Sequence, residues 1–281
     1  MHLGQIKSPG GLIAAVFENG MARPIPGHNM IALIRRSEVE KEPLSKLAAT
    51  LASRLPEEHA YALPISPPEV WGCGCTYEAS SSFRDAEHGT REGMYAYVYR
   101  EARPEIFFKG TARVCVATGS SIGIRADSKF TAPEPELALV LGTGGRIAGY
   151  TLANDVSAWD IERENALYLP QSKTYDCCCA LGPIMVTADA LPDPYSLNMT
   201  CTIVRDGKEL FAGSVSTSKL HRRVEALVES LTKSNHVPCG TVVLTGTGII
   251  VPAEGALAPG DVVTISVPEI GTLTNTAAIV E

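Results

Sequence analysis

The 281-residue sequence predicts a mixed α/β fold rich in β-strands, with a small N-terminal α+β domain before a larger β domain. Three observations predict this fold class. Short apolar runs recur along the chain and are separated by Gly, Pro, Asn or Asp. Clear helical spacing of apolar residues is confined to two segments. A proline-rich stretch at residues 63–71 divides the chain, so we expect domains at residues 1–65 and 66–281.

The N-terminal domain is expected to contain short strands and one helix. Residues 12–17 and 30–34 are apolar runs between turns rich in Pro and Gly, as strands would be. Residues 37–55 carry apolar side chains at helical spacing. The first apolar run is too short for an export signal, and Asn19-Gly20 after it is typical of a hairpin turn. We therefore expect a soluble, cytoplasmic protein.

The second domain is expected to be built mainly from strands. A hairpin turn is expected at residues 205–208, and a helix with one apolar face at residues 221–230. The apolar runs that predict strands are residues 114–117, 137–141, 147–152, 184–186, 199–204, 242–244, 262–267 and 277–280. Many short strands at this spacing indicate a β-rich barrel, sandwich or roll.

Composition excludes several classes of partner. The formal net charge is −7 and no basic cluster is present, which argues against nucleic acid as the main partner. No apolar stretch reaches the roughly 18 residues of a membrane-spanning helix. The eight cysteines, three of them consecutive, are expected to be reduced and mostly buried. A zinc site is the alternative, but Cys73-Gly74-Cys75 lacks the usual spacer of two to four residues.

Two glutamates stand just before a strongly apolar strand. In an extended chain Glu134 and Glu136 project to the same face, where they repel each other unless a cation or proton lies between them. Asp155, at the end of the next apolar run, could complete a set of oxygen ligands suited to Mg²⁺, Mn²⁺ or Ca²⁺. A solvated turn for the glutamates and a capping role for Asp155 are the alternatives.

Two further segments carry candidate polar groups. Lys173 lies between an apolar stretch and three consecutive cysteines, where partial burial would make it a usable acid–base group. A surface lysine is the alternative. Residues 243–249 form a glycine-punctuated loop after a strand, whose N–H groups and threonine hydroxyls could hold a substrate carboxylate. A plain turn would have the same sequence.

These fragments, taken in order, resemble the successive signatures of the fumarylacetoacetate hydrolase superfamily. They are residues 134–138, 149–157, 173–183, 245–247 and 260–275. The resemblance covers the chain from residue 71 onward. It implies a β-roll catalytic domain after a small N-terminal domain, in a protein that forms a homodimer or homotetramer.

The resemblance also implies roles for individual residues. Glu134, Glu136 and Asp155 would bind Mg²⁺, for which Mn²⁺ or Ca²⁺ could substitute. Lys173 and Thr247 would face the substrate, a small 2-oxo acid that chelates the ion through its carboxylate and keto oxygens.

Hydrolases of acylpyruvates in this superfamily usually carry the segment Gly-x-Asn-Tyr-x-x-His-x-x-Glu. This chain departs from that pattern at the His and Glu positions. Ser80 and Phe83 stand at the two positions, although Glu87-His88 could substitute from a loop. The resulting alternative is a C–C bond hydrolase that cleaves a 2,4-diketo-3-deoxy sugar acid or acylpyruvate to pyruvate and a second acid, with water activated by Glu87-His88 or by the metal. A non-catalytic binding protein on the same scaffold is another alternative.

The chain resembles more fully the 2-keto-3-deoxy-pentonate dehydratase branch, through residues 77–84, 103–109 and 161–173. This branch implies a Mg²⁺-dependent lyase that forms 2,5-dioxopentanoate in non-phosphorylative pentose catabolism. The expected catalytic residues are Lys173 as base and Glu78 as proton donor, with the two roles open to exchange. The expected substrate-binding residues are Arg84, Lys109, Gln171 and Thr247.

Overall fold

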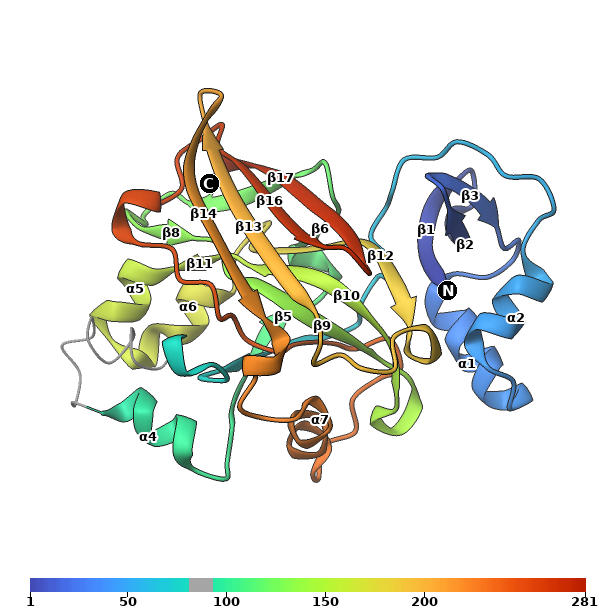
Figure 1. Ribbon diagram of the computed structural model, residues 1–281, viewed down its shortest axis with the longest axis horizontal. Helices are drawn as coiled ribbons and strands as arrows, with labels where there is room; N and C mark the ends of the chain where they lie inside the picture. The colour runs from blue at the N-terminus through green and yellow to red at the C-terminus, as the bar shows by residue number, and fades with distance from the viewer. Residues whose placement is uncertain (81–92) are drawn as a thin grey trace.

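The structure, a computed structural model, describes residues 1–80 and 93–281 (Figure 1). Its larger sheet contains β1 (His2–Ser8), β2 (Gly11–Glu18), β3 (Met21–Pro24), β4 (Val70–Gly74), β5 (Glu105–Gly110), β6 (Cys115–Val116), β9 (Pro135–Leu141), β10 (Ile147–Asp155), β12 (Cys179–Thr187) and β15 (Val242–Leu244). A second sheet contains β7 (Ser121–Arg125), β13 (Asn198–Arg205), β14 (Lys208–Ser216), β16 (Val262–Val267) and β17 (Gly271–Val280), and β8 (Thr131–Ala132) pairs with β11 (Ser157–Ala158). The helices include α1 (Met30–Glu40), α2 (Leu44–Leu51), α4 (Met94–Arg100), α5 (Trp159–Glu164), α6 (Leu169–Lys173) and α7 (Val224–Thr232).

Strand order places segments that are distant in sequence side by side. The larger sheet runs β3-β2-β1-β12-β10-β9-β15-β4-β5, with β6 beside β12, and the second runs β14-β13-β16-β17-β7. Each apolar run expected as a strand in the second domain overlaps an observed strand, although the run at residues 114–117 contains only the short β6. The β-rich, mixed α/β class is therefore confirmed.

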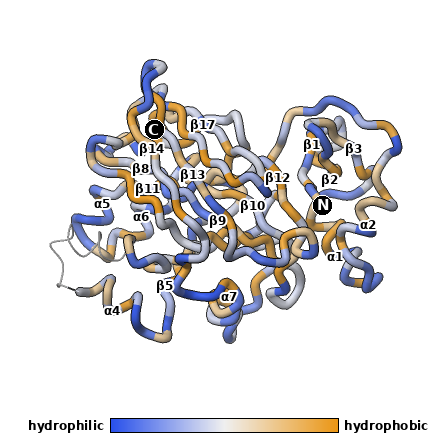
Figure 2. Tube along the Cα trace, viewed as in Figure 1, coloured by the Kyte–Doolittle hydropathy of each residue, from blue (hydrophilic) through white to orange (hydrophobic). Residues whose placement is uncertain are grey.

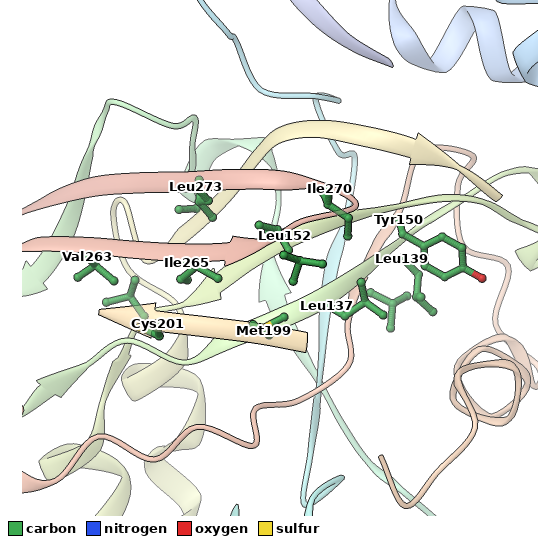
Figure 3. Close-up of a cluster of buried hydrophobic side chains, with 14 of the residues drawn as sticks. Leu137, Leu139, Tyr150, Leu152, Met199, Cys201, Val263, Ile265, Ile270 and Leu273 are labelled. Carbon is green, nitrogen blue, oxygen red and sulfur yellow. The ribbon is translucent and has the colours of Figure 1, made fainter. Parts of the chain in front are cut away.

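The two large sheets pack face to face over an apolar core. Leu137 and Leu139 of β9 and Leu152 of β10 belong to the same buried cluster as Cys201 of β13 and Ile265 of β16 (Figure 3). Every residue of β9 is buried, because this central strand is covered on both faces. The strands that carry the acidic residues are thereby held rigidly.

The hairpin and helix expected in the second domain are both present. Asp206 and Gly207 join β13 to β14 with positive φ angles of 51° and 75°, as a tight two-residue hairpin turn requires. The tip of this hairpin is hydrophilic, whereas apolar stretches lie along the strands of the interior (Figure 2). The helix expected at residues 221–230 is α7, which buries one apolar face.

The N-terminal segment differs from expectation in two places. Residues 30–34 were predicted as a strand but begin α1, because the Asn29 side chain accepts a hydrogen bond from the Ala32 N–H (2.9 Å) and caps the helix. The single helix predicted at residues 37–55 is also wrong. The chain leaves the helical path at Lys41, which has φ 54°, and Pro43 precedes the separate helix α2.

The N-terminal strands extend the larger sheet. β1 pairs antiparallel with β12, and a long connection leads from α2 back to β4 (Figure 1). Leu3, Val16 and Met30 share a buried cluster with Val140 and Met185 of the main sheet. A domain boundary near residue 65 stays a prediction, and the two parts share packing across it.

Within the described parts of the chain, no helix combines the length and the apolar character needed to cross a membrane. All eight cysteines lie in the described ranges and are free, and seven of them are buried. Among the described residues the grouping of potential metal ligands consists of carboxylates and includes no cysteine. The zinc alternative therefore has no support from the geometry.

Candidate metal centre and active site

The strand pair β9–β10 brings three carboxylates together. Glu134 precedes β9, Glu136 is its second residue, and Asp155 ends β10. Each residue is at most 2% exposed, and one carboxylate oxygen from each lies within 4.8 Å of the others. Their burial excludes the solvated turn. The three residues predicted as metal ligands thus share one site, which we call the acidic triad.

Main-chain groups fix the acidic triad. The Asp155 N–H donates to the carbonyl oxygen of Glu134 (2.9 Å), and the Glu134 N–H donates to Asn154 Oδ1 (3.0 Å). On the other side, the Gly246 N–H donates to Glu136 Oε2 (2.5 Å). The positions of the carboxylates are therefore set by the sheet and by the loop after β15.

Burial and the neighbouring negative charges raise the pKa of one carboxylate in the acidic triad. The pKa of Glu136 is raised well above its usual value by burial and by the charges of Asp155 and Glu134. A hydrogen bond from Gly246 and the charge of Lys173 act in the opposite direction without cancelling the effect. Three buried oxygen donors of this kind fit a hard divalent cation such as Mg²⁺, which would neutralise their repulsion.

Lys173 lies directly against the acidic triad. This last residue of α6 is fully buried, and its Nζ donates to Glu134 Oε1 (2.7 Å), Ser157 Oγ (2.7 Å) and Asp155 Oδ2 (3.3 Å). A surface position is therefore excluded. An amine that touches two carboxylates and a hydroxyl is well placed to exchange protons at this site.

Lys109 of β5 is the second buried lysine at the acidic triad. Its Nζ forms an ion pair with Asp155 Oδ1 (2.6 Å) and donates to the carbonyl oxygen of Val156 (3.0 Å). Burial acts to lower the pKa of Lys109, but the charges of Asp155, Cys178 and Cys179 and the hydrogen bond to Asp155 together outweigh burial, and the pKa is raised. Lys109 is therefore a charged partner of Asp155.

The loop after β15 borders the site through both its backbone and its side chains. Gly246 has φ 92°, and a β-carbon there would lie 2.0 Å from Thr76 Oγ1, so a glycine is needed. Its N–H binds Glu136 and is not directed at open space. Thr247 is 4% exposed, and its Oγ1 is 3.2 Å from both the nitrogen and the oxygen of Ile249.

The remaining predicted residues are not all at the acidic triad. Glu78 is exposed, and its charge raises the pKa of Tyr99 in α4 after the larger effect of burial. Gln171 is exposed in α6 and lines a pocket of about 460 Å³ with Phe107 and other residues. Arg84 and His88 lie outside the described residues. The roles predicted for these residues stay predictions.

The polar residues beside the triad and Lys173 that were not predicted as functional include Ser157, Trp159 and the buried Glu162, whose Oε2 is 3.9 Å from Lys173 Nζ. Ser157 Oγ accepts from Lys173 Nζ and donates to the carbonyl oxygen of Asp155 (2.8 Å). The indole Nε1 of Trp159 donates to Glu134 Oε1 (2.7 Å). Ser157 lies two residues after Asp155. The same two-residue spacing was used to place Glu134 and Glu136 on one face, so it could also have predicted Ser157. The contact of Trp159 depends on how the chain turns into α5.

Another carboxylate, Glu105, lies on strand β5 beside strand β4. Glu105 begins β5 opposite Gly74, where a β-carbon would be only 2.0 Å from Glu105 Oε2. The thiol of Cys75 donates to the same oxygen (3.3 Å). Burial, followed by the charges of Glu136 and Glu105, raises the pKa of Cys73, so both carboxylates act on one thiol. The two-residue spacing of the triad gives no signal for Glu105.

Known proteins resemble the chain over most of its length. Residues 86–278 match the fumarylacetoacetate (FAA) hydrolase C-terminal family. The chain is 48% identical over 213 residues to 2-dehydro-3-deoxy-D-arabinonate dehydratase of Saccharolobus solfataricus, covering 75% of this chain and 72% of that protein. It is 41% identical over 252 residues to a probable 2-keto-3-deoxyxylonate dehydratase of Haloferax volcanii, covering 89% and 86% respectively. A solved 2-keto-3-deoxy-D-arabinonate dehydratase complexed with magnesium and 2,5-dioxopentanoate is 38% identical, with a TM-score of 0.84 and full coverage of both chains.

Proposed function

Because the chain belongs to the fumarylacetoacetate hydrolase family, we propose that it is a Mg²⁺-dependent dehydratase converting a 2-keto-3-deoxy-pentonate to 2,5-dioxopentanoate. The observation that carries the proposal is the buried acidic triad with the Lys173 ammonium against it. The similarity to dehydratases of this substrate class supports the reaction type. The reaction would belong to non-phosphorylative pentose catabolism.

The acidic triad holds the ion in this proposal. Glu134, Glu136 and Asp155 supply the oxygen ligands, since their donor chemistry fits Mg²⁺. When bound, the ion would supply Lewis-acid charge that makes a C3 proton of a 2-oxo acid more acidic. The protein excludes water from this position by burying all three carboxylates.

Lys173 is the proposed base. It would act as a neutral amine, after its ammonium proton has passed to Glu134 Oε1 or Ser157 Oγ, which accept from Nζ, and the amine would then take the C3 proton. The C4 hydroxyl receives a proton from a second group and leaves as water. The unsaturated product then isomerises so that C5 becomes the aldehyde, and one water is lost overall.

Two carboxylates compete for the role of proton donor. Glu78 was predicted from the sequence and is exposed on the side of α4. Glu105 accepts from the Cys75 thiol, and its charge, like that of Glu136, acts on Cys73. We favour Glu105 as the donor, because its carboxylate is partly enclosed and accepts from the Cys75 thiol, whereas Glu78 is exposed.

Product analysis by NMR tests the proposed function. The Mg²⁺-loaded protein is incubated with D- and L-2-keto-3-deoxypentonate, and separately with the 2,4-diketo-3-deoxy acids. We expect 2,5-dioxopentanoate from one stereoisomer of the first pair. Pyruvate plus glycolate from the diketo acid, with the simple keto acid unchanged, would instead establish a C–C bond hydrolase.

We also propose that the protein is a cytoplasmic homodimer or homotetramer. Eight cysteines that form no disulfide bond suit a reducing compartment. Phe108, Leu167 and Tyr168 expose large apolar side chains near α6, as a subunit interface would. Light scattering coupled to size-exclusion chromatography measures the mass, and a monomer at micromolar concentration would contradict the assembly.

A further inference from the structure

The contacts of Lys109 all lie around one member of the acidic triad. Its side chain is fully buried, which is costly for an ammonium group unless partners compensate. Those partners are Asp155 Oδ1 at 2.6 Å and the carbonyl oxygen of Val156 at 3.0 Å. The Tyr175 ring centroid lies 5.9 Å from Nζ, and the Tyr175 hydroxyl donates to the same carbonyl (3.2 Å). Lys109 therefore contacts both the Asp155 carboxylate and the backbone carbonyl of the next residue, Val156.

The two oxygens of Asp155 have different lysine neighbours. Oδ1 is paired with Lys109, whereas Oδ2 is 3.3 Å from Lys173 Nζ. Lys173 Nζ is also 2.7 Å from Glu134 Oε1, so Oδ2 lies on the Glu134 side of the carboxylate. Rotation of the carboxylate would break the buried ion pair with Lys109. The pairing thus fixes the plane of the carboxylate, so that one of its two equivalent oxygens lies on the Glu134 side.

Charge and positioning have opposite effects on a bound cation. The positive charge of Lys109 repels a cation, so its removal should strengthen cation binding if charge alone mattered. A partner that orients a ligand has the reverse effect, because its removal leaves the ligand free to turn away. The direction of change in cation affinity therefore distinguishes the two roles.

We propose that Lys109 is a positioning residue that holds the Asp155 carboxylate with Oδ2 directed toward Glu134 and Glu136, ready to bind the cation. This inference rests on the Mg²⁺-dependent function proposed above. In this proposal Lys109 acts through Asp155, whereas the sequence resemblance predicted that Lys109 contacts the substrate.

Isothermal titration calorimetry of the metal-stripped full-length protein with Mg²⁺ alone tests the inference. Lys109→Met keeps the apolar stem and removes the donor, and we expect Mg²⁺ to bind it about 10–100-fold more weakly. Lys109→Gln retains an N–H donor on a shorter side chain and should fall between Lys109→Met and the wild type. Lys208→Met removes an exposed lysine and is the matched control, expected to bind like the wild type.

Enzyme kinetics separates positioning from contact with the substrate. If Lys109 positions Asp155, turnover by the variants should recover with excess Mg²⁺ while the KM for substrate stays near the wild-type value. A raised KM at saturating Mg²⁺, with unchanged Mg²⁺ affinity, would overturn the inference in favour of substrate contact.

The outcomes distinguish this inference from the proposed function. If the wild type binds no Mg²⁺, the proposed function fails with it. If the wild type binds Mg²⁺ and either folded Lys109 variant binds as tightly or more tightly, only the positioning role is overturned. Circular dichroism establishes which variants are folded. If Lys109→Met does not fold, the Mg²⁺ affinity of Lys109→Gln is compared with that of the wild type.

Discussion

Lys173 is the residue at which metal binding and proton transfer can be separated. Its Nζ contacts Glu134 and Asp155 but adds no oxygen ligand to the triad. Lys173→Met should lower turnover by about 10²–10⁴-fold, the usual contribution of a general acid or base. Mg²⁺ binding should persist, because removal of a positive charge reduces repulsion toward the cation. Product formation and calorimetry measure the two effects, and full activity in this variant would refute the assignment.

The proton donor can be identified by comparing two carboxylates. Glu105 is enclosed beside Cys75 and Gly74, whereas Glu78 is exposed. We expect Glu105→Gln to reduce kcat by about 10²-fold or more and Glu78→Gln to have a much smaller effect. Both replacements keep size and remove the titratable group. Steady-state rates at saturating Mg²⁺ provide the comparison, and the reverse order of effects would restore Glu78 as the donor.

The three acidic residues could be predicted from the sequence because they lie on two strands that are consecutive in the chain. Glu134 and Glu136 share a strand face, and Asp155 ends the next strand, so their proximity follows from one antiparallel pair. The contact of Lys109 with Asp155 is different in kind. β5 and β10 are not neighbours in the sheet, so this pair depends on side chains reaching across the interior.

At the scale of elements, helix caps and breaks explain the errors in the N-terminal segment. The apolar run at residues 30–34 suits a strand or a buried helix equally well, and periodicity alone cannot separate them. The cap from Asn29 decides in favour of the helix. Pro43 divides the predicted single helix, since a proline after a left-handed residue begins a new segment. Both signals were present in the sequence but were outweighed by the apolar pattern.

The turn before β16 is tied to the end of β13 by one buried carboxylate. Asp261 accepts from Arg205 Nε (2.8 Å) and Nη2 (2.7 Å) and from the Ala258 N–H (2.8 Å). Burial alone would raise the pKa of Asp261, but these hydrogen bonds outweigh burial and hold it below its usual value. We expect Asp261→Asn to lower the free energy of unfolding by about 1.5 kcal/mol, near the low end for bonds to a charged group because Arg205 is partly exposed.

The effect of Asp261→Asn should depend on pH. Because the folded protein holds the pKa of Asp261 low, its stabilisation is complete above the ordinary pKa of 3.8 and is lost as the pH falls through the folded value. The difference between wild type and variant should therefore be largest near neutrality and shrink below about pH 4. Urea unfolding at several pH values measures it, and a difference that grows on acidification would contradict the assignment.

At the scale of the whole molecule, the N-terminal segment and the main sheet share one core. Leu3 and Val16 are fully buried in the cluster that contains Val140 and Met185, and β1 hydrogen-bonds to β12. Neither part can bury this surface without the other. The chain should therefore unfold in a single cooperative transition, although the connection before β4 resembles a linker in sequence.

Differential scanning calorimetry of Leu3→Ala tests this cooperativity. Replacing a fully buried leucine costs about 2–5 kcal/mol, so the melting temperature should fall. Because the core is shared, the whole transition should move without splitting. Leu55→Ala, which shortens a leucine that is 76% exposed, is the control and should melt like the wild type. Two transitions, of which Leu3→Ala moves only one, would instead show that the N-terminal segment unfolds independently and would favour a true domain boundary near residue 65.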